Sequence, residues 1–117
     1  MRNESGQAKD YRIFERFAAR FPAKFKDTRE DYGQIVYLRD ASAQGAKLTC
    51  KERLYLNDHI SLEVKLPDSH SSMVLRGEVV WTKNKESNMW DIGLKFHKVK
   101  LLHISRLYKF CVPENSL

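Results

Sequence analysis

The 117-residue chain has few of the features that mark membrane and secreted proteins. No stretch approaches the roughly 18 consecutive apolar residues of a transmembrane helix, so we expect no membrane span. Residues 1–10 are polar and lack the apolar core of a signal peptide. The only cysteines are Cys50 and Cys111, and two cysteines without a secretory signal more often indicate reduced thiols in the cytosol than a disulfide. The sequence therefore predicts a cytoplasmic protein.

Signatures of catalysis and of metal binding are also missing from the sequence. It contains neither a P-loop nor a G-x-S-x-G motif, and neither cysteine has a second cysteine or a close ligand pair nearby. The four histidines are His59, His70, His97 and His103. Their spacing along the chain matches no metal-ligand pattern, which favours ordinary structural roles. We therefore expect no enzyme, no metal and no cofactor.

The composition is that of one small, basic domain. Such a short chain buries roughly two-thirds of its unfolded surface, so a large internal active-site cavity would weaken its core. Lys and Arg number 21 against 15 Asp and Glu, which gives a net charge of +6. This charge favours an anionic partner but does not choose between nucleic acid, anionic lipid and a phosphorylated small molecule.

The middle of the chain alternates apolar and polar residues, as half-buried strands do. Strands are predicted at residues 21–25, 34–38, 46–50, 59–66, 73–81 and 89–96. The polar residues 84–88 are predicted as a hairpin loop. Alternation with one wet face indicates an antiparallel sheet, and short strands joined by turns suggest a small barrel.

The two ends of the chain differ from the middle. Residues 1–10 lack large apolar side chains and are predicted to form a flexible lead-in. Apolar residues at helical spacing predict an amphipathic helix over 99–112, which Pro113 helps to end before a short tail, 113–117. The helix would close one end of the barrel or cover one face.

Three arginines near the N-terminus fit the pattern R-x-x-x-R in two registers. One register pairs Arg12 with Arg16, and the other pairs Arg16 with Arg20. Apolar residues at helical spacing over 11–21 permit a plainer interpretation, in which the arginines form a solvated stripe on a helix. The pattern alone does not decide between these interpretations.

A second motif, D-x-S-x-x-G, follows the strand predicted at 34–38. It consists of Asp40, Ser42 and Gly45. Asp and Ser favour turns because each can hydrogen-bond nearby backbone, and Gly permits positive φ or close approach of another group. Taken alone, this motif is equally consistent with a plain β-turn.

Together and in this order, the two motifs resemble the PilZ family. In that family R-x-x-x-R precedes the first strand and D-x-S-x-x-G follows the second. Residues 76–81 (RGEVVW) and 90–96 (WDIGLKF) resemble its last two strands, and a helix follows. The resemblance covers residues 11–112 and implies a mainly β fold: a six-stranded antiparallel, split β-barrel over 21–97 with a C-terminal α-helix over 99–112. It also implies a bacterial receptor for the messenger cyclic di-GMP.

The resemblance implies one ligand site on the outer face of the barrel. Its members would be Arg12, Arg16, Arg20, Asp40, Ser42 and Gly45. Because Phe21-Pro22 resembles the start of the family's first strand, we prefer Arg12 and Arg16 as the motif pair, with Arg20 as a third contact. Residues 11–20 would be an arm that orders on binding and changes contacts with an unidentified protein partner. We expect a monomer or weak homodimer.

Two alternatives stay open. The chain could be a PilZ-like adaptor that binds no nucleotide, although both motifs are intact. It could also be a small nucleic-acid-binding β-barrel that stacks bases on Tyr55, Trp81 and Trp90. Because both tryptophans lie in apolar strand patterns, where burial is usual, we expect no DNA binding.

Overall fold

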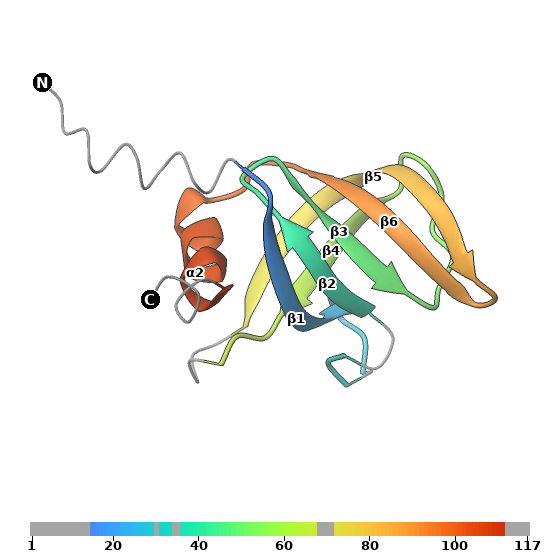
Figure 1. Ribbon diagram of the computed structural model, residues 1–117, viewed down its shortest axis with the longest axis horizontal. Coiled ribbons are helices and arrows are strands. Elements are labelled where there is room, and N and C mark those ends of the chain that lie inside the picture. Colours follow the sequence, from blue (N-terminus) through green and yellow to red (C-terminus); the bar gives the residue numbers. More distant parts are fainter. Residues whose placement is uncertain (1–14, 30, 34–35, 68–71, 112–117) are drawn as a thin grey trace, which may run out of the picture.

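The structure, a computed structural model, describes residues 15–29, 31–33, 36–67 and 72–111. The elements in these ranges are β1 (Phe17–Phe25), β2 (Val36–Ala41), β3 (Gly45–Cys50), β4 (His59–Val64), β5 (Met73–Glu86), β6 (Met89–Phe96) and α2 (Leu101–Cys111). Every strand pair is antiparallel, and the strands close into a ring in the order β1-β2-β3-β6-β5-β4 (Figure 1). The predicted fold class, a six-stranded antiparallel barrel with a C-terminal helix, is confirmed.

The alternating sequence pattern fills the barrel as predicted. In β4, Leu62 and Val64 are fully buried, while the intervening Glu63 is only partly covered. Met73 and Leu75 of β5 point into the same core. Because successive residues of a strand face opposite sides, this period-two pattern fixes which face of each strand becomes the barrel wall.

Helix α2 packs at one end of the barrel, beside β1 (Figure 1). Ile104 and Leu107, one turn apart, are fully buried against the core. The Tyr108 ring meets the Phe17 ring edge-on at 5.2 Å between centroids. No helix in the described part of the chain has the length and hydropathy that crossing a lipid bilayer requires.

Several element boundaries differ from those predicted. β3 begins at Gly45 rather than residue 46, β4 ends at Val64 rather than residue 66, and α2 spans Leu101–Cys111 rather than 99–112. β1 begins at Phe17 rather than Phe21, because Phe17 pairs with Ala41 of β2; the helical interpretation is therefore wrong for residues 17–21. β2 runs on to Ala41, so Asp40 lies in the strand. The loop predicted at 84–88 is also wrong, since β5 continues to Glu86 and a tight turn returns the chain to β6. In β1, β2 and β5, pairing with a neighbouring strand outweighed the local sequence signal.

Candidate functional site

The Asp-Ser-Gly motif forms the corner between β2 and β3. Asp40 lies near the end of β2, and Gly45 begins β3. The Ser42 N–H donates to the Gly45 carbonyl at 2.8 Å, and the Gln44 N–H donates to Ser42 Oγ at 3.1 Å. The buried Ser42 hydroxyl oxygen therefore holds the turn.

Gly45 is required by close approach of β3 to β6. Gly45 pairs with Lys95, and a Cβ at position 45 would collide with the carbonyl oxygen of Leu94. The Gln44 carbonyl, one residue earlier, accepts a hydrogen bond from the Phe96 N–H at 2.9 Å. Hydrogen bonds within the corner and to β6 therefore both hold it in place.

Arg16 reaches this corner because of the register between β1 and β2. Ala18 pairs with Asp40 across the strands, which places Arg16, directly before β1, beside the motif. The Arg16 guanidinium nitrogen lies 3.9 Å from Asp40 Oδ2, and Lys47 Nζ lies 4.0 Å from the same oxygen. The Arg16 side chain is 64% exposed, so the guanidinium is accessible to a ligand.

Trp81 of β5 lies on the side of the β2–β3 corner that faces away from Arg16. The pairing of β5 with β6 is irregular between Val79 and Trp81, and a bulge turns both Val80 and Trp81 outward. Trp81 pairs with Gly93, and the indole lies against the space that a Cβ at Gly93 would occupy. Trp81 remains 41% exposed, so the prediction that it is buried is wrong. Trp90, by contrast, is partly buried against the core.

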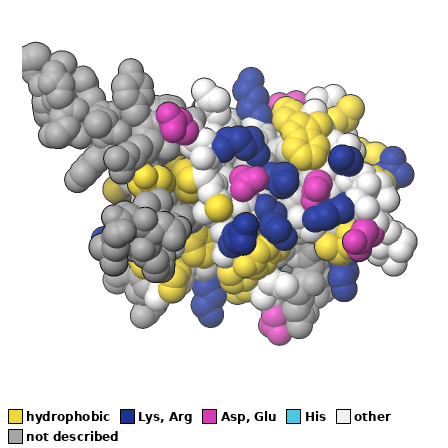
Figure 2. All heavy atoms as spheres, viewed as in Figure 1, with side chains coloured by type: hydrophobic (Ala, Val, Ile, Leu, Met, Phe, Trp, Pro, Cys, Tyr) yellow, Lys and Arg dark blue, Asp and Glu magenta, His cyan; other side chains and the backbone are white. Residues whose placement is uncertain are grey.

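Arg16, the β2–β3 corner and Trp81 border an open groove of about 600 Å³ on the outer face of the barrel. Its lining residues are Arg16, Ser42, Gln44, Gly45, Ala46, Val80, Trp81, Gly93, Leu94 and Lys95. Two other grooves in the described part of the chain contain no residue of either motif. Figure 2 shows Lys and Arg side chains gathered on the face that carries β1, β2 and β3, with a few acidic side chains among them. The groove thus combines cations, an aromatic face and polar backbone, which suits an anionic ligand with planar rings.

The structure brings together most of the predicted site residues that it describes. Arg16, Ser42 and Gly45 line the groove, and Asp40 lies at its rim through the ion pair with Arg16. Arg20 lies in β1 and is exposed, but it is not among the lining residues. Arg12 lies outside the described residues. Sequence reasoning missed Val80 and Lys95, and it considered Trp81 only as a stacking platform for nucleic acid. Gly93, a glycine within a strand, was the signal of a close approach there.

The sequence profile of the PilZ domain matches residues 10–112, nearly the whole chain. The chain belongs to the PilZ family. PilZ domains are receptors and adaptors for cyclic di-GMP rather than enzymes. The resemblance seen in the two motifs is therefore confirmed.

A solved structure supports the PilZ fold. The Bacillus subtilis inhibitor of motility (MotI/DgrA) superposes with a TM-score of 0.60 at 15% sequence identity, covering 86% of this chain and 49% of that one. The present chain therefore spans about half the length of that structure, and at this identity the likeness shows the fold alone. No curated protein matches the sequence significantly.

Proposed function

We propose that this PilZ domain is a cyclic di-GMP receptor whose N-terminal arginine segment closes over ligand held in the groove. The observation that supports this is the meeting of both motifs at one place: the Arg16 guanidinium lies 3.9 Å from Asp40, at the groove that Ser42 and Gly45 line. Arg12, four residues before Arg16, would supply the second guanidinium.

The chemistry of the groove matches the ligand. Cyclic di-GMP carries two guanines and two phosphate charges. A guanidinium presents a planar fork of donors that fits the O6 and N7 acceptors of guanine and also fits phosphate, whereas lysine supplies charge without that geometry. Asp40 can accept from guanine N1 and N2 or hold Arg16 in place. The exposed Trp81 indole offers a face on which a guanine can stack.

The energies explain why both motifs are needed. Ordering five residues of an arm costs on the order of 5–10 kcal/mol in backbone entropy. Each hydrogen bond to a charged group returns about 1.5–3 kcal/mol, and each stacked base about 1–3 kcal/mol. Micromolar affinity corresponds to about −8 kcal/mol, so several such contacts must form together. Arginines alone would not reach this value.

Ordering of the arm is also the proposed output. Residues 11–16 would lie over the ligand and change the surface offered to a protein partner, which is a known form of switch. The similar B. subtilis protein is named an inhibitor of motility, so the motility machinery is the first place to look for that partner.

The test is calorimetric titration of the full chain with cyclic di-GMP. We expect Arg12→Ala, Arg16→Ala and Asp40→Ala each to weaken binding roughly 10- to 150-fold, the loss of one charge-assisted contact. Arg29→Ala removes the same charge from an exposed arginine outside the groove and should leave affinity unchanged. Circular dichroism checks that each variant folds.

Three outcomes would contradict the proposal. Undiminished affinity in both Arg12→Ala and Arg16→Ala would remove the site assignment. Absence of binding to the wild-type chain would favour an adaptor that binds no nucleotide. Unchanged hydrogen exchange over residues 8–16 on addition of ligand would exclude ordering of the arm, since residues 17–20 are already part of β1.

A further inference from the structure

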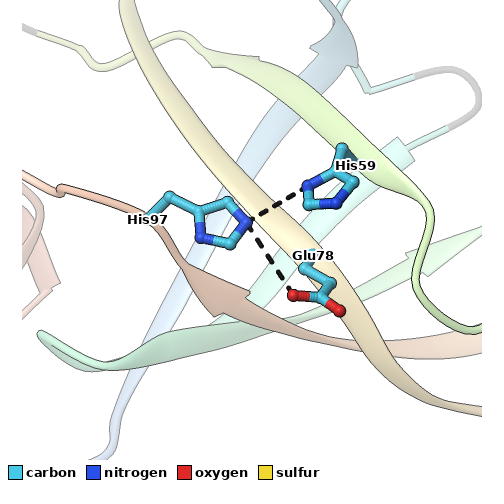
Figure 3. A group of neighbouring side chains, drawn as sticks. All are labelled: His59, Glu78 and His97. Carbon is cyan, nitrogen blue, oxygen red and sulfur yellow. Dashed lines mark hydrogen bonds and ion pairs between the residues drawn. The ribbon is translucent and has the colours of Figure 1, made fainter.

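Three strands bring two histidines and a glutamate together on the barrel wall. His59 is the first residue of β4, Glu78 lies in β5, and His97 directly follows β6. His59 and Glu78 are cross-strand partners, and the His97 N–H donates to the carbonyl of Arg76 at 2.9 Å. Figure 3 shows both imidazole rings and the carboxylate directed toward one another above β5.

The three possible ligand atoms lie nearly as close to one another as they would around a single metal ion. His97 Nε2 lies 3.3 Å from His59 Nδ1 and 4.0 Å from Glu78 Oε1, and the three ligand atoms all lie within 4.8 Å of one another. A tetrahedral zinc ion with nitrogen ligands at about 2.0–2.1 Å holds two such nitrogens about 3.3–3.4 Å apart. The two imidazoles therefore already have the spacing of zinc ligands, and a small rotation of Glu78 would bring its carboxylate to the metal.

The backbone under each ligand is held by the barrel, so the group is preorganised. The two rings stack with centroids 5.2 Å apart and planes at 25°. Next to Glu78, the Val79 N–H donates to the Asp58 carbonyl at 2.9 Å, which ties β5 to the start of β4. His59 and His97 are both exposed, so a metal ion can enter from solvent without unfolding the barrel.

We propose that His59 Nδ1, His97 Nε2 and Glu78 Oε1 bind one Zn²⁺ ion, with the fourth position open to water or to a donor from a partner. Two imidazoles and one carboxylate suit zinc, whereas calcium and magnesium prefer oxygen ligands throughout. Lys95 of β6 is the cross-strand neighbour of Glu78. This site does not depend on cyclic di-GMP binding.

The sequence pattern did not predict this group, because its three residues are far apart in the chain. Known zinc signatures place ligands a few residues apart on one turn or helix. Here the ligands lie in β4, in β5 and directly after β6, and only the β4-β5-β6 pairing makes them neighbours. The expectation that these histidines have plain structural roles is replaced by this proposal.

The test is titration of the chelator-treated full chain with Zn²⁺, followed by calorimetry and by the melting temperature. We expect saturable 1:1 binding and a rise in Tm that EDTA reverses. In place of Zn²⁺, Co²⁺ should give the visible absorption of a tetrahedral site without a thiolate charge-transfer band. His59→Ala and His97→Ala should each weaken binding at least about tenfold. Glu78→Gln should weaken it as well, while His103→Ala, on α2, should leave it unchanged.

A readout on the wild-type chain keeps the proposal testable if a variant fails to fold. In NMR spectra, Zn²⁺ should shift the imidazole resonances of His59 and His97 and leave those of His103 in place. The proposal is overturned if Zn²⁺ does not bind saturably, if binding is undiminished in His59→Ala and His97→Ala, or if His103 responds as strongly as His97.

Discussion

Trp81 owes its exposed position to the bulge at Val80 and to the glycine opposite. Without the bulge, strict alternation would turn one of Val80 and Trp81 into the core; instead they are 46% and 41% exposed. Because Gly93 has no side chain, the indole lies flat against β6 at the edge of the groove. A large aromatic face is thus held in place before any ligand arrives, which limits the entropy lost on stacking.

Trp81→Ala should weaken cyclic di-GMP binding roughly 5- to 150-fold, the value of one stacked base, measured by calorimetry. Trp81→Phe should retain part of the affinity because an aromatic face remains. Gly93→Ala should also weaken binding, since its Cβ would displace the indole. Tyr55→Ala is the matched control: Tyr55 is 59% exposed but lies outside the groove, and equal losses at Tyr55 and Trp81 would argue against stacking in the groove.

Cys50 is a buried thiol whose ionisation the fold opposes. Burial, the largest cause, raises the pKa of Cys50 from 9.0 to about 11, and the protonated thiol donates to the Glu52 carbonyl at 3.1 Å. Because the folded pKa is the higher one, the protonated thiol favours folding below about pH 9, and this contribution is lost as the pH rises toward 11.

The measurable consequence is slow thiol chemistry. In a Cys111→Ser background at pH 8, the thiolate fraction of Cys50 should be roughly a hundredfold below that of an ordinary cysteine, and burial slows the reagent further. Reaction with a chromogenic disulfide should therefore be slow in the native protein and fast in denaturant. Equally fast labelling in both conditions would mean that Cys50 is accessible.

Strands with clean alternation were predictable, and strand ends were not. The pattern of residues 59–66 indicated β4 and its buried face, and β6 matches its predicted range of residues 89–96. The extensions of β1 to Phe17 and of β5 to Glu86 depend on partners distant in the sequence. Local patterns cannot contain that information, because pairing decides where a strand stops.

The buried and exposed faces of helix α2 should contribute differently to the free energy of unfolding. Leu107→Ala should lower the free energy of unfolding by about 2–5 kcal/mol, since Leu107 is fully buried at the barrel end. Leu102→Ala, on the same helix but 73% exposed, should change it by less than about 0.5 kcal/mol. Urea denaturation measures both. Similar small effects in the two variants would mean that the helix does not close the barrel.

The groove exists only in the closed barrel, because its walls come from distant parts of the chain. Arg16 precedes β1, the Asp-Ser-Gly corner joins β2 to β3, and Trp81 lies in β5. Motif order in the sequence identified the first two walls, and the structure brings Arg16 within 3.9 Å of Asp40. The third wall was not predicted, because the apolar pattern around Trp81 indicated burial; Gly93, a glycine within β6, was the one sign of a close approach there.

The net charge of +6 makes salt dependence a test of the whole molecule. A protein that neutralises six to ten phosphates of duplex DNA loses about 10³–10⁵ in affinity between 50 and 200 mM salt, because condensed counterions are released. Cyclic di-GMP has two phosphates and no such counterion layer, and much of its binding would come from stacking and directed hydrogen bonds. We therefore expect its affinity to fall less than about tenfold over the same range. A steep fall for cyclic di-GMP, or DNA binding tighter than dinucleotide binding at 200 mM salt, would favour a general polyanion surface over a specific receptor site.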